Sequence, residues 1–189
     1  MKKLASTIAA ATALLALPMA ANAIVFQFNA TLTGAQENPP VTSSATGVAT
    51  LFYNDMNTVA TADDSYSFSM VASGGLSFNP VAYHLHQGAV GVNGGVQVNL
   101  AAAPFVSIFS GGTLLVGGNN ITSPSPTLLS NLKAGLEYVN IHTGANSGGE
   151  IRGQLLQVAA IPEPATYAMF GLGLGLMGVF SRRRAAKSS

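Results

Sequence analysis

The sequence predicts an all-β fold, an antiparallel, Greek-key-like β-sandwich with one short helix. Three observations support this class. Several short segments alternate apolar and polar side chains, which is typical of strands with one buried face. Gly, Pro, Asn and Asp separate these segments at short and regular intervals. Cysteine is absent, so core packing and backbone pairing must hold the domain together without disulfides.

Residues 1–23 have the order of a cleavable secretory signal peptide. Two lysines precede an apolar run over 4–17, and the small residues at 21–23 favour cleavage by signal peptidase after Ala23. The apolar run is shorter than the roughly 20 residues that a transmembrane helix needs. We therefore expect an exported chain whose mature form begins near Ile24.

The central domain is expected over residues 24–161, and its strands follow in order along the chain. A helix of one or two turns interrupts them, with Ser125 as N-cap, Pro126 at the first helical position and Gly135 as the stop. The helix is expected to close an open end of the sheet pair. The expected strands span 26–33, 48–52, 65–70, 81–86, 96–100, 105–109, 136–142 and 150–158.

The last segment, 162–189, has three parts in a fixed order. A mostly apolar stretch over 165–180 is expected to form a short transmembrane helix, and it lies between two polar motifs. The motifs are Pro162, Glu163 and Pro164 before the stretch, and Arg182, Arg183 and Arg184 after it. This order resembles a PEP-CTERM sorting signal. The resemblance implies an exosortase-type sorting enzyme as partner, an inner-membrane intermediate, and final display at the cell surface or release outside the cell.

Composition excludes some partners and favours others. Residues 24–161 contain six acidic and two basic residues, a formal charge of −4, so no basic patch is available for nucleic acid. Charged residues make up 8% of the chain, against roughly 25% in ordinary soluble domains. A surface of uncharged polar residues suits neutral partners such as exopolysaccharide or other matrix proteins.

The three histidines form the candidate metal site. His84 and His86 are two apart on one expected strand, so both side chains point to the same face with about 7 Å between their Cα atoms. If the strand that carries His142 packs nearby, three imidazoles could bind copper or zinc. Glu150 could then accept a hydrogen bond from an imidazole and fix its tautomer. Alternatively, the histidines are structural and bind loop carbonyls.

Glu150 and Arg152 lie on the same face of the last expected strand. One interpretation is a surface ion pair, which contributes about 0–1 kcal/mol. The other is a polar cluster with Glu37 or Glu137 that orients the histidines. The sequence favours the structural interpretation, because a buried Arg without carboxylate partners would be costly. No nucleophile triad, phosphate loop or paired-carboxylate motif is present, which favours a non-enzymatic protein.

Three groups of segments together resemble the CHRD domain, a module found in many exported bacterial proteins. The most specific motif is the Gly-Gly-Glu-Ile-Arg-Gly run over 148–153. The resemblance implies a β-rich extracellular domain, and it implies no agreed catalytic mechanism. The segments span 28–41 with 45–47, 84–88 with 91–94, and 134–143 with 146–155.

A weaker resemblance involves the copper/zinc superoxide dismutases, which also have a β-sandwich with a His-x-His strand, a later His and a final-strand Arg. Here His84, His86, His142 and Arg152 would take those places. The chain lacks the histidine-rich loop and the disulfide of those enzymes. The leading prediction is therefore a non-enzymatic surface or matrix module with a structural or binding role, and the alternative is a copper- or zinc-binding redox protein.

Overall fold

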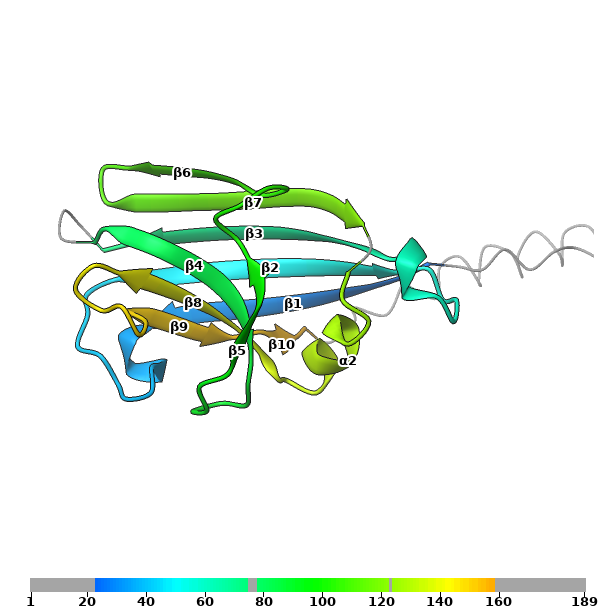
Figure 1. Ribbon diagram of the computed structural model, residues 1–189, viewed down its shortest axis with the longest axis horizontal. Coiled ribbons are helices and arrows are strands. Elements are labelled where there is room, and N and C mark those ends of the chain that lie inside the picture. The colour runs from blue at the N-terminus through cyan, green and yellow to red at the C-terminus, as the bar shows by residue number, and fades with distance from the viewer. Residues whose placement is uncertain (1–22, 75–77, 123, 159–189) are drawn as a thin grey trace, which may run out of the picture. The chain divides into compact units, whose positions relative to one another are not determined.

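The computed structural model describes residues 23–74, 78–122 and 124–158, and here the all-β prediction is confirmed. Strands dominate, with a short α-helix and two 3-10 turns between them (Figure 1). The strands are β1 Ile24–Thr33, β2 Thr46–Asp55, β3 Ser65–Ser73, β4 Pro80–Gln87, β5 Gly95–Asn99, β6 Val106–Ser110, β7 Thr113–Thr122, β8 Glu137–Thr143, β9 Ile151–Gln154 and β10 Leu156–Gln157. The helical elements are η2 Gly34–Gln36, η3 Thr61–Asp63 and α2 Leu128–Lys133.

Two of the expected elements lie outside the described residues. They are the signal peptide, of which only Ala23 is described, and the hydrophobic helix over 165–180. Ala23 is exposed and immediately precedes β1. Within the described ranges, no helix has the length and apolar character needed to cross a membrane.

The described strands form one antiparallel sheet that folds over on itself. Its order is β5-β4-β8-β9-β1-β2-β3-β7-β6, and β10 pairs with β1 beside β9. In Figure 1, β4, β5, β8 and β9 pass in front of the layer formed by β1, β2, β3, β7 and β6. The two ends of this order also approach each other, because the Tyr83 hydroxyl on β4, next to the edge strand β5, donates to Ser107 Oγ on the edge strand β6 at 2.6 Å. The connections β3–β4, β5–β6 and β7–β8 cross between layers, as in Greek-key folds.

The core lies between the two layers. Both layers supply fully buried side chains, among them Phe28 and Leu51 from one and Leu85 and Val139 from the other. Alternation along β1, β2 and β3 places every second residue in this core, as the sequence pattern predicts. Helix α2 adds two leucines to the same cluster at the end where β1 begins (Figure 1). This agrees with the closing role expected for the helix.

Three details differ from the sequence prediction. Strand β7 was not predicted, because Gly117-Gly118-Asn119-Asn120 has the composition of a turn, yet it pairs with β3 through an irregular register. Helix α2 begins at Leu128 rather than at Pro126, and Thr127 at its N-cap makes no side-chain capping bond. The strand expected over 150–158 is divided into β9, which pairs mainly with β8, and β10, which pairs with β1. Between them, the amide of Leu155 donates to the carbonyl of Glu137.

Candidate metal centre

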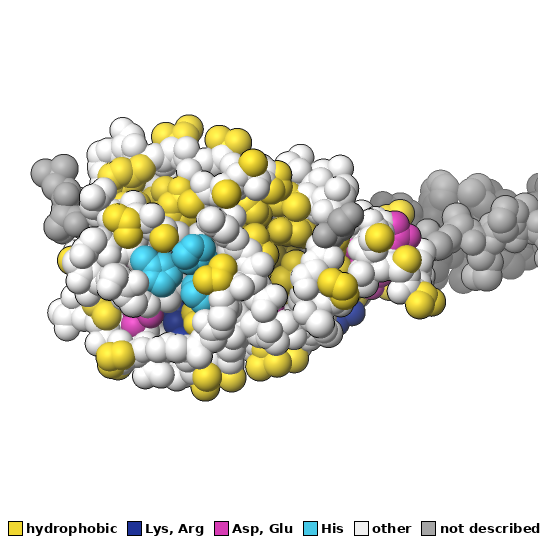
Figure 2. Space-filling model, in the orientation of Figure 1, with side chains coloured by type: hydrophobic (Ala, Val, Ile, Leu, Met, Phe, Trp, Pro, Cys, Tyr) yellow, Lys and Arg dark blue, Asp and Glu magenta, His cyan; other side chains and the backbone are white. Residues whose placement is uncertain are grey.

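The histidines lie on one face of the β4–β8 strand pair. In this register, Ala82 faces His142 and His84 faces Asn140. Facing residues of antiparallel strands point to the same side of a sheet, so His84, His86 and His142 share one face. It is the face opposite the core. Figure 2 shows the three histidines of the chain gathered in a single patch there.

Each imidazole turns one nitrogen toward the other two. One candidate ligand atom from each histidine lies within 4.8 Å of the others, and no carboxylate joins this group among the described residues. The buried ring nitrogens without a hydrogen-bond partner in the described ranges are His84 Nδ1, His86 Nε2 and His142 Nε2. Leaving one such atom unpaired costs about 1–3 kcal/mol. Small ring rotations would bring the three nitrogens to the roughly 3.3 Å separations that tetrahedral bonds of about 2.0–2.1 Å require.

Backbone carbonyls fix the tautomers of two of these imidazoles. His86 Nδ1 donates to Gly94 O at 3.0 Å, and His142 Nδ1 donates to Ser147 O at 2.9 Å. A carbonyl oxygen can only accept, so each ring carries its proton on Nδ1 and leaves Nε2 free as a ligand. Burial, and secondarily the neighbouring imidazoles, lower the pKa of His84 and His86, although the Gly94 bond partly opposes this at His86. Both are therefore neutral at pH 7, the form that binds metal.

Tyr138 supports His86 in two ways. Its ring stacks on the imidazole, with centroids 5.1 Å apart and planes inclined by 11°. Its hydroxyl oxygen accepts from the amide of Gly94 at 3.0 Å, and the carbonyl of Gly94 holds His86. The tyrosine thus fixes both the ring plane of the histidine and its hydrogen-bond partner.

Arg152 lies beneath this assembly rather than at the surface. The side chain is only 1% exposed, and its Cζ lies 3.4 Å from the centroid of the Tyr138 ring. Its nitrogens donate to Ala89 O at 2.9 Å and to Asn93 Oδ1 at 3.4 Å. The cation–π contact and these two bonds offset the desolvation of the guanidinium, so the charge is tolerated in a buried position without an ion pair to a carboxylate of the described residues.

Two loops cover the polar face, and they are tied to each other. Asn38 Nδ2 donates to Gly91 O, and Asn93 Nδ2 donates to Asn38 O, both at 2.7 Å. Gln154 on β9 holds the start of the second loop by donating to Gly88 O at 2.9 Å. The loops over 34–41 and 88–94 therefore set the position of the carbonyl that orients His86.

Glu37 belongs to the first of these loops, and its side chain is buried. Burial raises its pKa to about 7, although the charge of Arg152 and a hydrogen bond from Asn140 lower it. A Cβ on Gly149 would lie 2.6 Å from Glu37 Oε1 and from the Asn140 amide, and Gly149 has φ +135°. This position of the Gly-Gly-Glu-Ile-Arg-Gly run therefore admits glycine and no larger residue.

The carboxylate of Glu150 has partners other than a histidine. It accepts from Ser43 Oγ at 2.7 Å, Thr143 Oγ1 at 2.5 Å and Asn146 Nδ2 at 3.3 Å. Burial raises its pKa, but these three hydrogen bonds together hold it below the ordinary value. Glu150 thus secures the loop that supplies the Ser147 carbonyl, and its effect on His142 is indirect.

Sequence reasoning found some of these residues and missed others. The three predicted ligands lie together, and Arg152 lies near Glu37, whereas Glu137 faces the core and contacts Asn131 of α2. The expected surface ion pair of Arg152 is wrong, because this side chain is buried against Tyr138. Tyr138 was missed, although its alternation with Asn140 and His142 along β8 indicated it. The carbonyls of Gly94 and Ser147 leave no pattern in a sequence.

Comparison with protein-family models gives two matches. Residues 160–184 match the PEP-CTERM protein-sorting motif, which implies processing by an exosortase-type enzyme and export to the cell surface or the extracellular space. Neither the comparison with curated proteins nor the comparison with solved structures gives a match. Residues 28–155, which include the whole histidine site and both covering loops, match the CHRD domain, and the chain therefore belongs to the CHRD domain family.

Proposed function

We propose that the mature protein is a non-enzymatic surface or matrix module that binds copper or zinc through His84, His86 and His142. The observation that carries the proposal is the convergence of three unpartnered, buried ring nitrogens. Two of the rings have their other nitrogen committed to a carbonyl, the usual arrangement of metal-binding histidines. A structural role alone would not require the free nitrogens to face each other.

The structure weakens the analogy with superoxide dismutase. In that analogy Arg152 would take the place of the final-strand arginine, but here the guanidinium is buried beneath Tyr138 and bonded to the loop over 88–94. We therefore favour metal binding over dismutation. Passage through an inner-membrane intermediate, anchored by the segment over 165–180, is part of the same proposal.

Metal titration tests the function directly. Purified protein over residues 24–161 is titrated with Cu(II) and with Zn(II), and bound metal and the melting temperature are measured. Wild type should bind one ion with a higher melting temperature, because an ion that binds only the folded state stabilises it. His86→Ala should lose most of the affinity, since β4 then offers one imidazole.

Val96→Ala is the matched control. Val96 faces His86 from β5, is 53% exposed and offers no ligand atom, so this variant should bind as the wild type does. Equal and weak binding by wild type and His86→Ala, with unchanged melting temperatures, would show that the histidines are structural.

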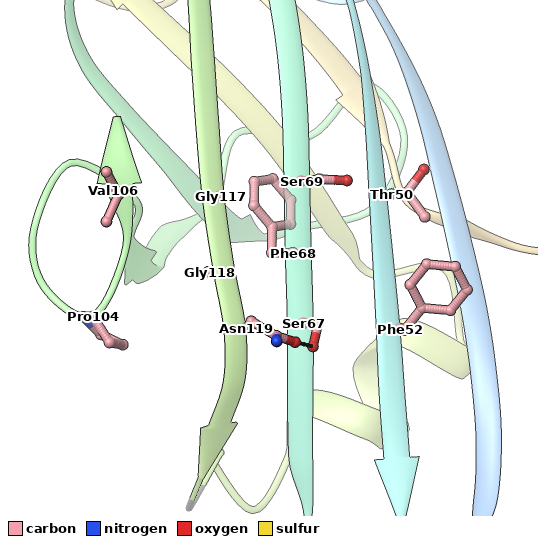
Figure 3. Close-up of a pocket in the computed structure, with 10 residues that line it drawn as sticks. All are labelled: Thr50, Phe52, Ser67, Phe68, Ser69, Pro104, Val106, Gly117, Gly118 and Asn119. Carbon is pink, nitrogen blue, oxygen red and sulfur yellow. Dashed lines mark hydrogen bonds between the residues drawn. The ribbon is translucent and has the colours of Figure 1, made fainter. Parts of the chain in front are cut away.

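A second candidate function, binding of neutral exopolysaccharide, is favoured by the outer face of β2, β3, β7 and β6. A row of exposed apolar residues crosses these strands in register: Val48, Val71, Leu115 and Ile108. Beside it lies an open pocket of about 560 Å³ without a charged lining residue (Figure 3). It is lined by hydroxyl and amide side chains, by the glycines of β7, and by the apolar residues Phe52, Phe68, Pro104 and Val106. Aromatic and uncharged polar groups of this kind suit a neutral sugar chain.

A further inference from the structure

A permanent positive charge lies one aromatic ring away from the proposed metal site. Strand β8 lies between β4 and β9, so the Tyr138 ring lies between the His86 imidazole and the Arg152 guanidinium. The contacts on the two sides are 5.1 Å between ring centroids and 3.4 Å from Cζ to the ring centroid. Because Arg152 is 1% exposed, water screens this charge little.

The ligands do not compensate that charge. An imidazole binds a metal ion in its neutral form and so adds no negative charge, and no carboxylate of the described residues lies in the group of candidate ligands. A bound ion therefore keeps its full charge, and the guanidinium repels it in proportion to that charge. A divalent ion is repelled twice as strongly as a monovalent one at the same position.

We propose that the site selects copper in its monovalent state, and that Arg152 is the positioning residue that sets this preference through Tyr138. The inference rests on the proposed metal-binding function. Imidazole is a suitable ligand for copper, and divalent copper prefers square-planar or tetragonal sites, which the three histidines alone do not supply. At a separation of roughly 10 Å and an effective dielectric constant of about 20, one unit of charge changes relative affinity on the order of tenfold.

Glu37 offers a second way to change the net charge beside the proposed metal site. Its carboxyl group is 6% exposed and is subject to the field of Arg152, and it is not a member of the ligand group. At pH 8 Glu37 is ionised, since its pKa is about 7, and it offsets part of the guanidinium charge. Removing the carboxylate should therefore strengthen the preference for monovalent copper, and removing the guanidinium should weaken it.

The test is anaerobic competition at pH 8 against one chelator for Cu(I) and another for Cu(II). Arg152→Met should raise Cu(II) affinity relative to Cu(I) affinity on the order of tenfold. Glu37→Gln should shift the ratio in the opposite direction. Arg152→Lys keeps the charge and should retain most of the wild-type ratio, although it loses the planar stacking on Tyr138.

A general loss of packing cannot shift the Cu(II)/Cu(I) affinity ratio in one direction in Arg152→Met and in the other direction in Glu37→Gln. If both variants bind copper with the wild-type Cu(II)/Cu(I) ratio, the inference is wrong while metal binding stands. If His86→Ala binds either copper ion as tightly as the wild type, the proposed function itself is wrong. If Arg152→Met does not fold, the test rests on Glu37→Gln. An unchanged Cu(II)/Cu(I) affinity ratio in this variant would then overturn the inference.

Discussion

Glu137 is a carboxyl group held inside the core at the start of β8. It is 0% exposed, accepts one hydrogen bond from Asn131 Nδ2 at 2.9 Å, and its Oε2 has no partner in the described part of the chain. Burial raises the pKa of Glu137 to about 7, although the Asn131 bond lowers it. The folded state therefore retains a proton on this group that the unfolded state releases near pH 4.5.

This residue should make stability fall as pH rises. Because the folded pKa is raised, the contribution of Glu137 is fully present below about pH 4.5 and is lost as pH rises to about 7. Glu137→Gln should remove that dependence and increase the free energy of unfolding at pH 8 by about 2–3 kcal/mol. Urea unfolding of wild type and variant at pH 4.5 and pH 8 measures the effect. If the free energy of unfolding falls by the same amount between these two pH values in wild type and in Glu137→Gln, Glu137 is not the source of the pH dependence.

At the scale of elements, the β8–β9 loop links the histidine site to the sheet. Glu150 closes this loop on Thr143 and Asn146 and connects it to Ser43. The loop in turn presents the Ser147 carbonyl to His142. Local hydrogen bonds in the loop therefore determine which nitrogen of His142 is free.

Glu150→Gln should weaken both the loop and the metal site. The substitution replaces a carboxylate that accepts three hydrogen bonds by an amide with one acceptor oxygen. The free energy of unfolding should therefore fall by about 1–3 kcal/mol. Metal affinity should fall by about 10- to 100-fold, the range for lost support of a ligand. Because the pKa of Glu150 is lowered, its contribution is present above the unfolded pKa and lost on acidification, opposite to Glu137. Urea unfolding and copper titration measure the two effects, and wild-type values of both would refute this role.

At the scale of the whole molecule, the folded sheet has two different outer surfaces. The β4–β8–β9 surface carries the histidine patch of Figure 2, and the loop over 88–94 on this surface holds Arg152. The β2–β3–β7–β6 surface carries the row of exposed apolar residues and the pocket in Figure 3, whose lining residues include no charged side chain. The two proposed functions, metal binding and attachment to a neutral polysaccharide, therefore belong to different surfaces of the sheet.

Phe52→Ala tests the attachment surface. Phe52 is 44% exposed and lines the pocket, so its loss should weaken binding to neutral exopolysaccharide by about three- to tenfold, the range for one aromatic contact. Val81→Ala, at a 61% exposed position on β4 in the other layer, is the control and should leave binding unchanged. Co-sedimentation with the polysaccharide measures the difference. Identical binding by both variants and the wild type would exclude this surface.

The sequence alone determined the fold class, the shared face of His84 and His86, and the family, because alternation, turn residues and local motifs are properties of neighbouring residues. His142 joins that pair only through the pairing of β8 with β4. The sequence could not show β7, since glycine and asparagine in a strand have the composition of a turn until β3 pairs with them. It also could not show that Arg152 is buried on Tyr138, or that the carbonyls of Gly94 and Ser147 orient the histidines. The contact of Arg152 with Tyr138 joins residues that only the register of β4, β8 and β9 and the two loops bring together. The two carbonyls could not be predicted because every residue has the same backbone atoms, whatever its side chain.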